Sequence, residues 1–548
     1  MTSLEAPRVL LPRPEPGIPR LRTRWAVVTA LAGGAALAAA FPPAGVWPLA
    51  AVGPALLVLA LSGRGLRASF LIGLAFGVTF FLPLLAWVIN VAWYAWLALS
   101  IAETVIFAVL AIGQRLLLRL PGWPAAVAGW WVAVEGVRDR WPWGFPWGRL
   151  AMSQAGAPTA GWAAIGGASL LTFLVALAGA TLAWLLLTVL RAGGVRREIA
   201  RGGGSLRYPA LALAATAGLA LAGAALPADP VGKVPTAVVA AIQGNVPRAR
   251  SLSAQLDDTT VTQNHAAATI QLARQVASGR MAAPDLVIWP ENSTSLDPRL
   301  YPPIHQEISA AVAAIGRPVL VGAVLENPVR NAGQLWLPGK GPVAEYVKRR
   351  LVPFGEYIPF RSIVSKITSL TQLQPVDFTP GHTNVVFRAG AIRLGDVICY
   401  EIGFDDLVRS DVTGGANLLA MQTNDATFER DGQAGETEQQ LAMARVRAVE
   451  QDRAVIVAST TGVSAIIAPN GGIMASSGGT WRQAILEARV PLITHRTLAA
   501  DAGPWPEYVL IMLTVLALVA AVIRRPRPDP AQPDISADTA TDLGSPIN

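Results

Sequence analysis

The chain has 548 residues, few of them charged, and it is poor in cysteine and histidine. Only 15% of the residues are Asp, Glu, Lys or Arg, whereas soluble globular proteins usually have about a quarter. The single cysteine, Cys399, cannot form an intramolecular disulfide. The four histidines occur in no HExxH or paired spacing, which leaves a zinc site poorly supported. We therefore expect chemistry that uses no metal and no other cofactor.

Apolar residues are abundant instead, and they gather in long runs. They make up 52% of the chain, and several runs approach the roughly 20 residues that a helix needs to cross a bilayer. Tryptophans cluster at the ends of these runs, as interfacial aromatic residues do. The predicted membrane spans are residues 25–40, 47–61, 68–89, 93–117, 123–137, 163–190, 208–226 and 508–523.

The net charge of +8 comes from arginines that lie between the apolar runs. They occur before the first run, in residues 64–67, 115–119 and 191–207, and after the last run. This is the pattern of cytoplasmic loops in membrane proteins. It places both termini in the cytoplasm and the region after residue 228 outside. No basic stripe with interleaved aromatic residues is present, so we expect no nucleic-acid partner.

The chain divides into five parts by composition. We expect an N-terminal cytoplasmic segment (1–24), a seven-helix membrane domain (25–227), an extracytoplasmic globular domain (234–491), a C-terminal transmembrane helix (505–523) and a disordered cytoplasmic tail (524–548). In the globular domain, short β-branched runs alternate with helical stretches such as residues 436–453, which predicts an α/β layered fold. The predicted strands are residues 238–242, 285–289, 319–324, 392–400, 454–459 and 464–468.

Three reactive side chains follow β-like runs in the globular domain: Glu291, Lys348 and Cys399. Functional groups often gather at strand ends in such domains. A free thiol is mostly protonated at neutral pH, so a nucleophilic cysteine needs a neighbouring base or cation. Glu291 can take the thiol proton, and Lys348 can stabilise the oxyanion that forms when the sulfur attacks a carbonyl group. We therefore predict an acyl-accepting cysteine.

The flanking residues resemble those of a known family. WPE at residues 289–291, LVPFGEYIP at 351–359 and ICYE at 398–401 are similar to motifs of the nitrilase, or carbon-nitrogen hydrolase, superfamily. IQGNVP at residues 242–247, TNDATF at 423–428 and the flanking apolar runs extend the resemblance to its membrane-bound branch, the apolipoprotein N-acyltransferases. The resemblance covers nearly the whole chain. It implies a nitrilase-like αββα sandwich joined to a multi-pass membrane domain of about eight spans.

The resemblance also implies residue roles. It makes Glu291, Lys348 and Cys399 the catalytic triad, with Glu356, Tyr400 and Glu401 as supporting residues. We also expect substrate contacts from Trp147, which lies in the aromatic stretch at residues 141–147, and from Trp289, Phe354 and Asn424.

The implied reaction is acyl transfer in two steps at a bacterial cell membrane. A phospholipid gives its sn-1 acyl chain to the cysteine, and the thioester then acylates the N-terminal amine of a diacylglyceryl-cysteine on an apolipoprotein. We expect a monomer. Residues 248–252 and Thr427 depart from some relatives, which puts substrate preference in doubt more than the reaction type.

Other interpretations of these residues remain open at this stage. Glu356 could cap a turn after Gly355, Glu401 could be a structural carboxylate, and Glu103 could make an interhelical hydrogen bond. A cysteine–histidine site would use His382, although the Pro-Gly-His sequence suggests a turn. The whole chain could also be a membrane-tethered amidase or nitrile hydrolase, or a catalytically silent membrane scaffold.

Overall fold

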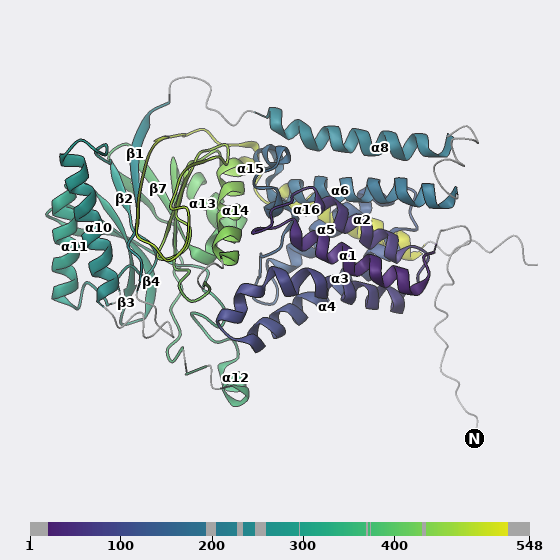
Figure 1. The fold of residues 1–548 in the computed structure, drawn as a ribbon, viewed down its shortest axis with the longest axis horizontal. Coiled ribbons are helices and arrows are strands. Elements are labelled where there is room, and N and C mark those ends of the chain that lie inside the picture. Colours follow the sequence, from purple (N-terminus) through teal and green to yellow (C-terminus); the bar gives the residue numbers. More distant parts are fainter. Residues whose placement is uncertain are drawn as a thin grey trace, which may run out of the picture.

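The computed structural model describes residues 20–192, 204–226, 234–246, 259–294, 296–368, 371–372, 374–429 and 434–523. A bundle of helices occupies one end of the molecule, and a β-sandwich flanked by helices occupies the other (Figure 1). The predicted N-terminal segment before residue 20, the predicted tail (524–548) and residues 248–252 lie outside the described residues.

A helix occurs at each of the eight predicted spans, but not all are long. Among the described residues, five helical segments are long and apolar enough to cross a membrane: 66–84, 93–117, 158–191, 204–225 and 505–523. The other three have 17, 13 and 16 residues, so the prediction of eight full spans is not confirmed. The bundle consists of α1 (Thr23–Ala39), α2 (Leu49–Leu61), α3 (Leu66–Leu84), α4 (Trp93–Leu117), α5 (Trp123–Arg138), α6 (Ala163–Arg191), α8 (Gly204–Leu221) and α16 (Trp505–Ile523).

Small residues let the first helices of the bundle approach closely. A Cβ atom on Gly34 of α1 would lie 2.1 Å from the carbonyl oxygen of Phe76 on α3. Lipid tails are as apolar as the helices themselves, so contacts of this kind, rather than the hydrophobic effect, hold such helices together. Short 3₁₀ helices and loops join the helices at the end that faces the sandwich, namely η1 (Ala86–Asn90), η2 (Leu150–Gln154) and η3 (Pro158–Trp162).

The sandwich consists of two six-stranded sheets. The first has the order β12-β1-β2-β3-β4-β5, and the second has the order β11-β10-β9-β8-β7-β6. Strands β1, β2 and β3 are parallel, as are β7, β8 and β9. The strand bounds are β1 (Thr236–Gln243), β2 (Leu286–Ile288), β3 (Val319–Leu325), β4 (Arg330–Leu337), β5 (Gly341–Val347), β6 (Val386–Ala389), β7 (Ile392–Ile398), β8 (Leu418–Thr423), β9 (Val455–Ser459), β10 (Ala465–Ile467), β11 (Ile473–Ser476) and β12 (Ala484–Pro491).

Helices cover both outer faces of the sandwich, which gives the predicted αββα order of layers (Figure 1). The helices α10 (Thr260–Ala277) and α11 (Pro302–Ile315) pack on the first sheet. The helices α13 (Asp405–Thr413) and α14 (Gly435–Gln451) pack on the second sheet, between it and the bundle. The short α12 (Arg361–Ile367) belongs to a long connection after β5, and α15 (Leu498–Ala502) precedes α16.

The predicted strands all occur, and one of them ends earlier than expected. We predicted a strand over residues 392–400, whereas β7 ends at Ile398 and the 3₁₀ helix η6 (Cys399–Gly403) follows directly. Cys399 has a positive φ of 53°, a left-handed conformation that a continuing strand does not permit. The predicted helix over residues 436–453 is α14.

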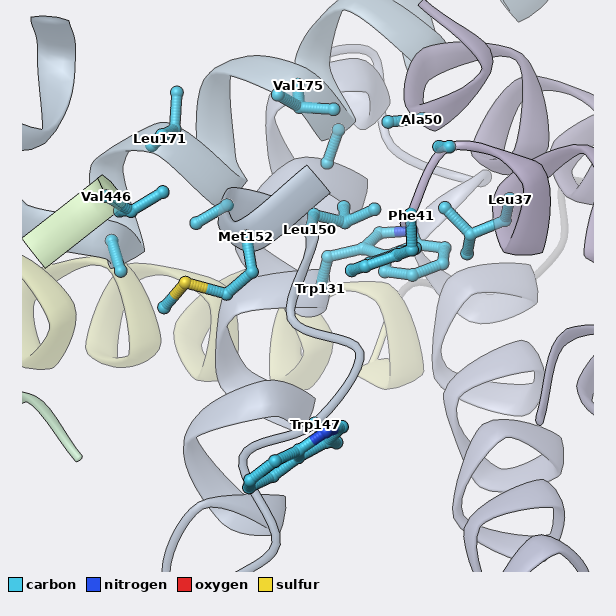
Figure 2. Packing of buried hydrophobic residues seen from close by; sticks show 14 of the residues in the cluster. Leu37, Phe41, Ala50, Trp131, Trp147, Leu150, Met152, Leu171, Val175 and Val446 are labelled. Carbon is cyan, nitrogen blue, oxygen red and sulfur yellow. The ribbon is translucent and has the colours of Figure 1, made fainter. Parts of the chain in front are cut away.

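The bundle and the sandwich share one buried apolar cluster. It contains residues of the membrane helices together with residues of α14 and the second sheet. Figure 2 shows Val446 of α14 beside Leu171 of α6 and Met152 of η2. Polar contacts reinforce the joint, because Gln439 of α14 donates a hydrogen bond of 3.0 Å to the carbonyl oxygen of Leu84. The sandwich is therefore held directly against the membrane helices.

Candidate active site

The three predicted reactive residues converge at one end of the sandwich. Glu291 follows β2 and Lys348 follows β5 in the first sheet, while Cys399 follows β7 in the second. Residues from all three strand ends belong to the same buried cluster between the sheets. Gly322 on β3 permits tight packing here, since a Cβ atom on it would lie 2.7 Å from the Cα atom of Glu291.

A buried ammonium group lies between two carboxylates. Lys348 is 1% exposed, and its Nζ donates hydrogen bonds of 2.9 Å to Oε1 of Glu291 and 3.0 Å to Oε1 of Glu356. Burying an ammonium ion alone would be costly, but these two charge-assisted hydrogen bonds offset that cost. The other oxygen of Glu356 accepts a hydrogen bond of 2.8 Å from the backbone N–H of Val352. Glu356 therefore caps the PFGE turn with one oxygen and binds Lys348 with the other, so the capping role does not exclude a supporting role in the site.

Asn331 is a member of this cluster that the sequence did not reveal. Its Nδ2 lies 2.6 Å from Oε1 of Glu291 and 2.8 Å from Oε1 of Glu356. It is 2% exposed and lies on β4, which also contains Arg330 and the buried Gln334, so its polar side chain alone did not mark it as a site residue. The backbone N–H of Asn424 adds a hydrogen bond of 2.9 Å to Oε2 of Glu291. Glu291 is thus held on both oxygens by donors from three different segments.

Cys399 is held in the sharp turn between β7 and η6. It is 5% exposed, and Nε2 of Gln440 on α14 lies 3.5 Å from its Sγ. The same amide nitrogen of Gln440 donates a hydrogen bond to Glu436. Neither α14 residue was predicted, because nothing in the sequence shows that this helix crosses behind the cysteine.

The electrostatics of the site keep the resting thiol protonated. Burial raises the pKa of Cys399 well above its usual value, and the charge of Glu291 raises it further. The Lys348 ammonium lowers the pKa of Cys399, whereas the Glu436 and Asp425 carboxylates raise this pKa. A nearby base must therefore take the proton as the sulfur attacks.

Glu291 is suited to that task. Burial raises its pKa above the usual value, and the Glu356 carboxylate adds to this, whereas Lys348 lowers it. Burial alone would lower the pKa of Lys348, but the charges of Glu291 and Glu356 raise it well above the usual value. The lysine therefore stays charged, and Glu291 is a stronger base than a carboxylate in water.

Glu401 is a structural carboxylate in this arrangement. One oxygen accepts hydrogen bonds from the backbone N–H groups of Arg349 and Arg350, and both oxygens accept from the hydroxyl of Tyr346. The second oxygen also accepts a bond of 2.9 Å from the N–H of Ile398. Glu401 therefore ties the residues after β5 to the end of β7, which fixes Lys348 relative to Cys399.

Tyr400 joins the site to the membrane bundle. Its ring stacks on Trp147 with centroids 5.5 Å apart, and its hydroxyl donates to the carbonyl oxygen of Gly144. Trp147 is 2% exposed and also contacts Trp87. In Figure 2, Trp147 lies apart from the main group of labelled side chains, on the loop before Leu150. Trp147 therefore packs against the residue next to Cys399.

The other predicted substrate contacts lie in different settings. Phe354 is 52% exposed, has a φ of +65° and contacts the ring of Trp143 at 6.0 Å, so it is open to a ligand. Asn424 holds Glu291 through its backbone, as described. Trp289 is fully buried, and its Nε1 donates to Thr269 of α10. The indole lies between the first sheet and its outer helices, so this position does not suit the substrate contact that we predicted.

The remaining candidates lie away from the thiol. His382 is exposed, whereas Cys399 is buried, so their positions do not favour a cysteine–histidine pair. Glu103 of α4 accepts a hydrogen bond of 2.5 Å from Arg138 of α5, which is the interhelical role considered above. In the part of the chain that the structure describes, no three His, Cys, Asp or Glu side chains gather as ligands of a metal ion.

Comparison with known proteins identifies the family of this chain. Residues 33–181 match the family model of the apolipoprotein N-acyltransferase N-terminal domain, and residues 238–500 match that of the carbon-nitrogen hydrolases. The apolipoprotein N-acyltransferase of Mycolicibacterium smegmatis is 37% identical over 91% of this chain and 85% of its own length. The chain belongs to the apolipoprotein N-acyltransferase family. The family resemblance and the fold class inferred from the sequence are therefore confirmed, and the chain is an acyltransferase.

More distant matches extend the comparison. The apolipoprotein N-acyltransferase of Azotobacter vinelandii is 30% identical over 90% of this chain and 94% of its own length. A solved amidase of Nesterenkonia, from the nitrilase superfamily, aligns with a TM-score of 0.36 and 16% identity over 51% of this chain and 99% of that chain. The two family models together place the apolipoprotein N-acyltransferase N-terminal domain at residues 33–181 and the carbon-nitrogen hydrolase domain at residues 238–500.

Proposed function

We propose that this enzyme moves an acyl chain from a membrane phospholipid to the N-terminal amine of diacylglyceryl-cysteine on apolipoproteins, through a thioester on Cys399. The buried Glu291–Lys348–Glu356 cluster at the strand ends carries this proposal, because it provides a base and a cation next to a protonated thiol. Glu291 acts as the base, and Lys348 binds the oxyanion. Glu356 and Asn331 hold both groups in place.

In the first step, Glu291 takes the proton of the thiol as Sγ attacks the ester carbonyl carbon of the phospholipid. The carbonyl oxygen gains a negative charge, which Lys348 stabilises. The tetrahedral intermediate then breaks the bond to the glycerol oxygen. Protonated Glu291 returns its proton to that oxygen, so a lysophospholipid leaves and a Cys399 thioester remains.

In the second step, the amine of the apolipoprotein attacks the thioester carbonyl carbon. Glu291 takes one N–H proton, the C–S bond breaks, and Cys399 regains the proton as the amide product leaves. A thioester reacts readily with an amine, and it survives long enough only if water is kept out of the site. The 5% exposure of Cys399 is consistent with such exclusion.

The position of the site next to the membrane bundle supports a lipid donor. Tyr400, beside the nucleophile, stacks on Trp147 of the bundle. Trp143 contacts both Phe354 and Phe360, and the three side chains remain 41%, 52% and 70% exposed. An exposed apolar group of this kind next to a reactive site suits the approach of acyl chains.

We place the sandwich on the extracytoplasmic face of a bacterial cell membrane, with both termini in the cytoplasm. The end of the bundle away from the sandwich carries the arginines of residues 64–67 and 115–119, as well as Arg191 (Figure 1). Arginine-rich loops of membrane proteins stay on the cytoplasmic side. We expect the enzyme to act as a monomer, since the base, cation and nucleophile all come from one chain.

Product analysis tests this function. The purified enzyme is incubated with a phospholipid labelled in its sn-1 acyl chain and with a diacylglyceryl-peptide that has a free N-terminus. We expect the label in an N-acylated peptide with wild-type enzyme and none with Cys399→Ala. Release of labelled fatty acid without N-acylated peptide would favour a membrane-tethered hydrolase, and no reaction of either kind would favour a scaffold.

A further inference from the structure

A pocket lined by arginines lies in the membrane bundle, at the end away from the sandwich. It has a volume of about 240 Å³ and lies between the α2–α3 turn and the last turn of α4. The α3–α4 connection, by contrast, contacts the sandwich, because Asn90 donates a hydrogen bond of 2.7 Å to the carbonyl oxygen of Phe428. The pocket is therefore separated from Cys399 by the length of α3. The residues that line it are Arg64, Gly65, Leu66, Arg67, Ala68, Arg115 and Arg119.

The lining of this pocket is strongly positive. It contains four guanidinium groups and, among the described residues, no carboxylate. Arg64 and Arg115 are only 2% and 4% exposed. Nη1 and Nη2 of Arg64 donate to Thr23 and Leu21, but its buried Nε has no hydrogen-bond partner in the described part of the chain. A buried donor without a partner is costly, which favours an acceptor from outside the described part of the chain.

Helix α3 adds a second source of positive potential. It begins at Leu66, and its N-cap residue, Gly65, has no side chain that could accept hydrogen bonds from the first turn. The first N–H groups of an α-helix have no partner within the helix and carry a partial positive charge, so they attract anions. Apart from its two chain neighbours, no heavy atom of the described residues lies within 4 Å of the position that a Cβ atom of Gly65 would occupy, so this turn is open. A phosphate group suits both a helix N-terminus and a fork of arginines.

Apolar surface continues from the pocket along α3. Leu71 follows Arg67 by one helical turn and is 63% exposed, and Val78, further along the same face, is 40% exposed. A soluble anion would gain nothing from this surface, whereas the acyl chains of a phospholipid would lie on it. Burial and the nearby charge of Arg20 lower the pKa of Arg64, which is consistent with a cluster of cations that lacks an anion.

We propose that this pocket binds the phosphate of an anionic membrane phospholipid in the leaflet opposite the active site, with the acyl chains along α3. The phosphate oxygens accept hydrogen bonds from the arginine side chains and from the N-terminus of α3. Basic pockets between transmembrane helices on the cytoplasmic side bind such headgroups. The bound lipid is distinct from the acyl donor, because Cys399 lies at the other end of the bundle.

Native mass spectrometry of the detergent-purified enzyme tests this proposal, with phosphatidylglycerol as the anionic probe and phosphatidylcholine as the zwitterionic one. The pocket variant is the double substitution Arg67→Ala and Arg119→Ala, which leaves the buried Arg64 and Arg115 in place. The matched control removes two arginines at the same end of the bundle but outside the pocket, Arg24→Ala with Arg191→Ala. Equal unfolding midpoints without added lipid establish that each variant is folded.

We expect wild-type and control enzyme to retain phosphatidylglycerol in preference to phosphatidylcholine, and the pocket variant to lose at least roughly tenfold in phosphatidylglycerol affinity. Equal retention by wild type and pocket variant would overturn the proposal. An equal loss in the control variant would also overturn it, because it would show a general charge effect. Binding of inorganic phosphate without retention of phosphatidylglycerol would assign the pocket to a soluble anion and refute the lipid.

Discussion

Replacing Glu291 by glutamine removes the proposed base while keeping its shape. In the structure, Oε1 of Glu291 accepts hydrogen bonds from Lys348 and Asn331, and Oε2 accepts one from the backbone N–H of Asn424. All three partners are donors. The NH2 group of a glutamine must therefore face at least one donor, and the amide cannot take the proton of Cys399.

The size of the effect follows from these losses. A positioned general base contributes typically 10²- to 10⁴-fold to a rate, and each tenfold change corresponds to about 1.36 kcal/mol of activation free energy. One lost hydrogen bond to a charged group costs about 1.5–3 kcal/mol more. We expect Glu291→Gln to slow formation of the acyl-enzyme by roughly 10³-fold or more.

The assay is single-turnover acylation of Cys399 by a labelled phospholipid, followed by quenching and mass spectrometry. Alkylation by a small thiol reagent is a less direct measurement, because removing the charge of Glu291 also removes one cause that raises the pKa of Cys399. The matched control is Glu345→Gln. Glu345 lies on β5 near Lys348, but it contacts Arg330 at 3.5 Å and is partly exposed.

The pH dependence gives an independent check. Glu291 must be deprotonated to act as a base, so wild-type acylation should rise with pH through the pKa of this group, which burial raises above its usual value. The Glu291→Gln enzyme should lack this rise, and Glu345→Gln should keep it. A Glu291→Gln enzyme that is acylated within about threefold of the wild-type rate, with the same pH dependence, would refute the base assignment.

Three further predictions concern the surroundings of the site. Asn331→Ala removes a donor to two carboxylates, so the acylation rate should fall roughly 10- to 100-fold, at about 1.5–3 kcal/mol for a charged hydrogen bond; an unchanged rate would contradict this role. Asp405→Asn removes the α13 carboxylate that pairs with the buried Arg447 and Arg149. Arg447 keeps Glu450 and Arg149 keeps Asp139, so a loss of about 1.5–3 kcal/mol, as for a hydrogen bond to a charged group, should lower the unfolding midpoint in a thermal scan. Burial lowers the pKa of His265 from 6.5 to about 4, so the folded state binds fewer protons than the unfolded state, and about 3 kcal/mol of stability present above pH 6.5 is lost as the pH falls toward 4. Scans across this range should show a smaller loss for His265→Gln than for wild type.

Much of this fold could be predicted from the sequence because its signals are local. Apolar runs mark the bundle helices, and β-branched runs bounded by turn residues mark strands such as β1 and β3. The lengths of the crossing helices were harder to predict. Apolar residues continue into loops and short 3₁₀ helices, as at residues 85–90, so the runs overstate how far a helix such as α3 extends.

Three residues of the site could be predicted because they also lie beside local sequence signals. Glu291, Lys348 and Cys399 each stand next to a strand, so their neighbours in the sequence reveal them. Asn331 and Gln440 reach the site from β4 and α14, and only the packing of the two sheets and their outer helices brings them there.

Trp289 shows the opposite limitation. The tryptophan is two residues before Glu291 in the WPE motif, but β2 ends at Ile288, so the alternation of the strand does not extend to Glu291. Successive side chains of a strand point to opposite faces, and Trp289 follows Val287 on the outer face of the first sheet, whereas Ile288 lies between the sheets. Its indole therefore enters the outer layer, where it donates to Thr269. Proximity in sequence to a reactive residue did not place this side chain in the site.

The central claim is that Cys399 carries the acyl group between donor and acceptor. Wild-type enzyme is incubated with a phospholipid bearing a heavy-isotope acyl chain, without acceptor peptide, and is then digested and analysed by mass spectrometry. We predict that the peptide containing Cys399 gains the mass of the labelled acyl chain, and that addition of a diacylglyceryl-peptide removes this mass and transfers it to the amine. Labelled product formed by a Cys399→Ala enzyme, or an acyl group found on another residue and transferred from there, would contradict the account.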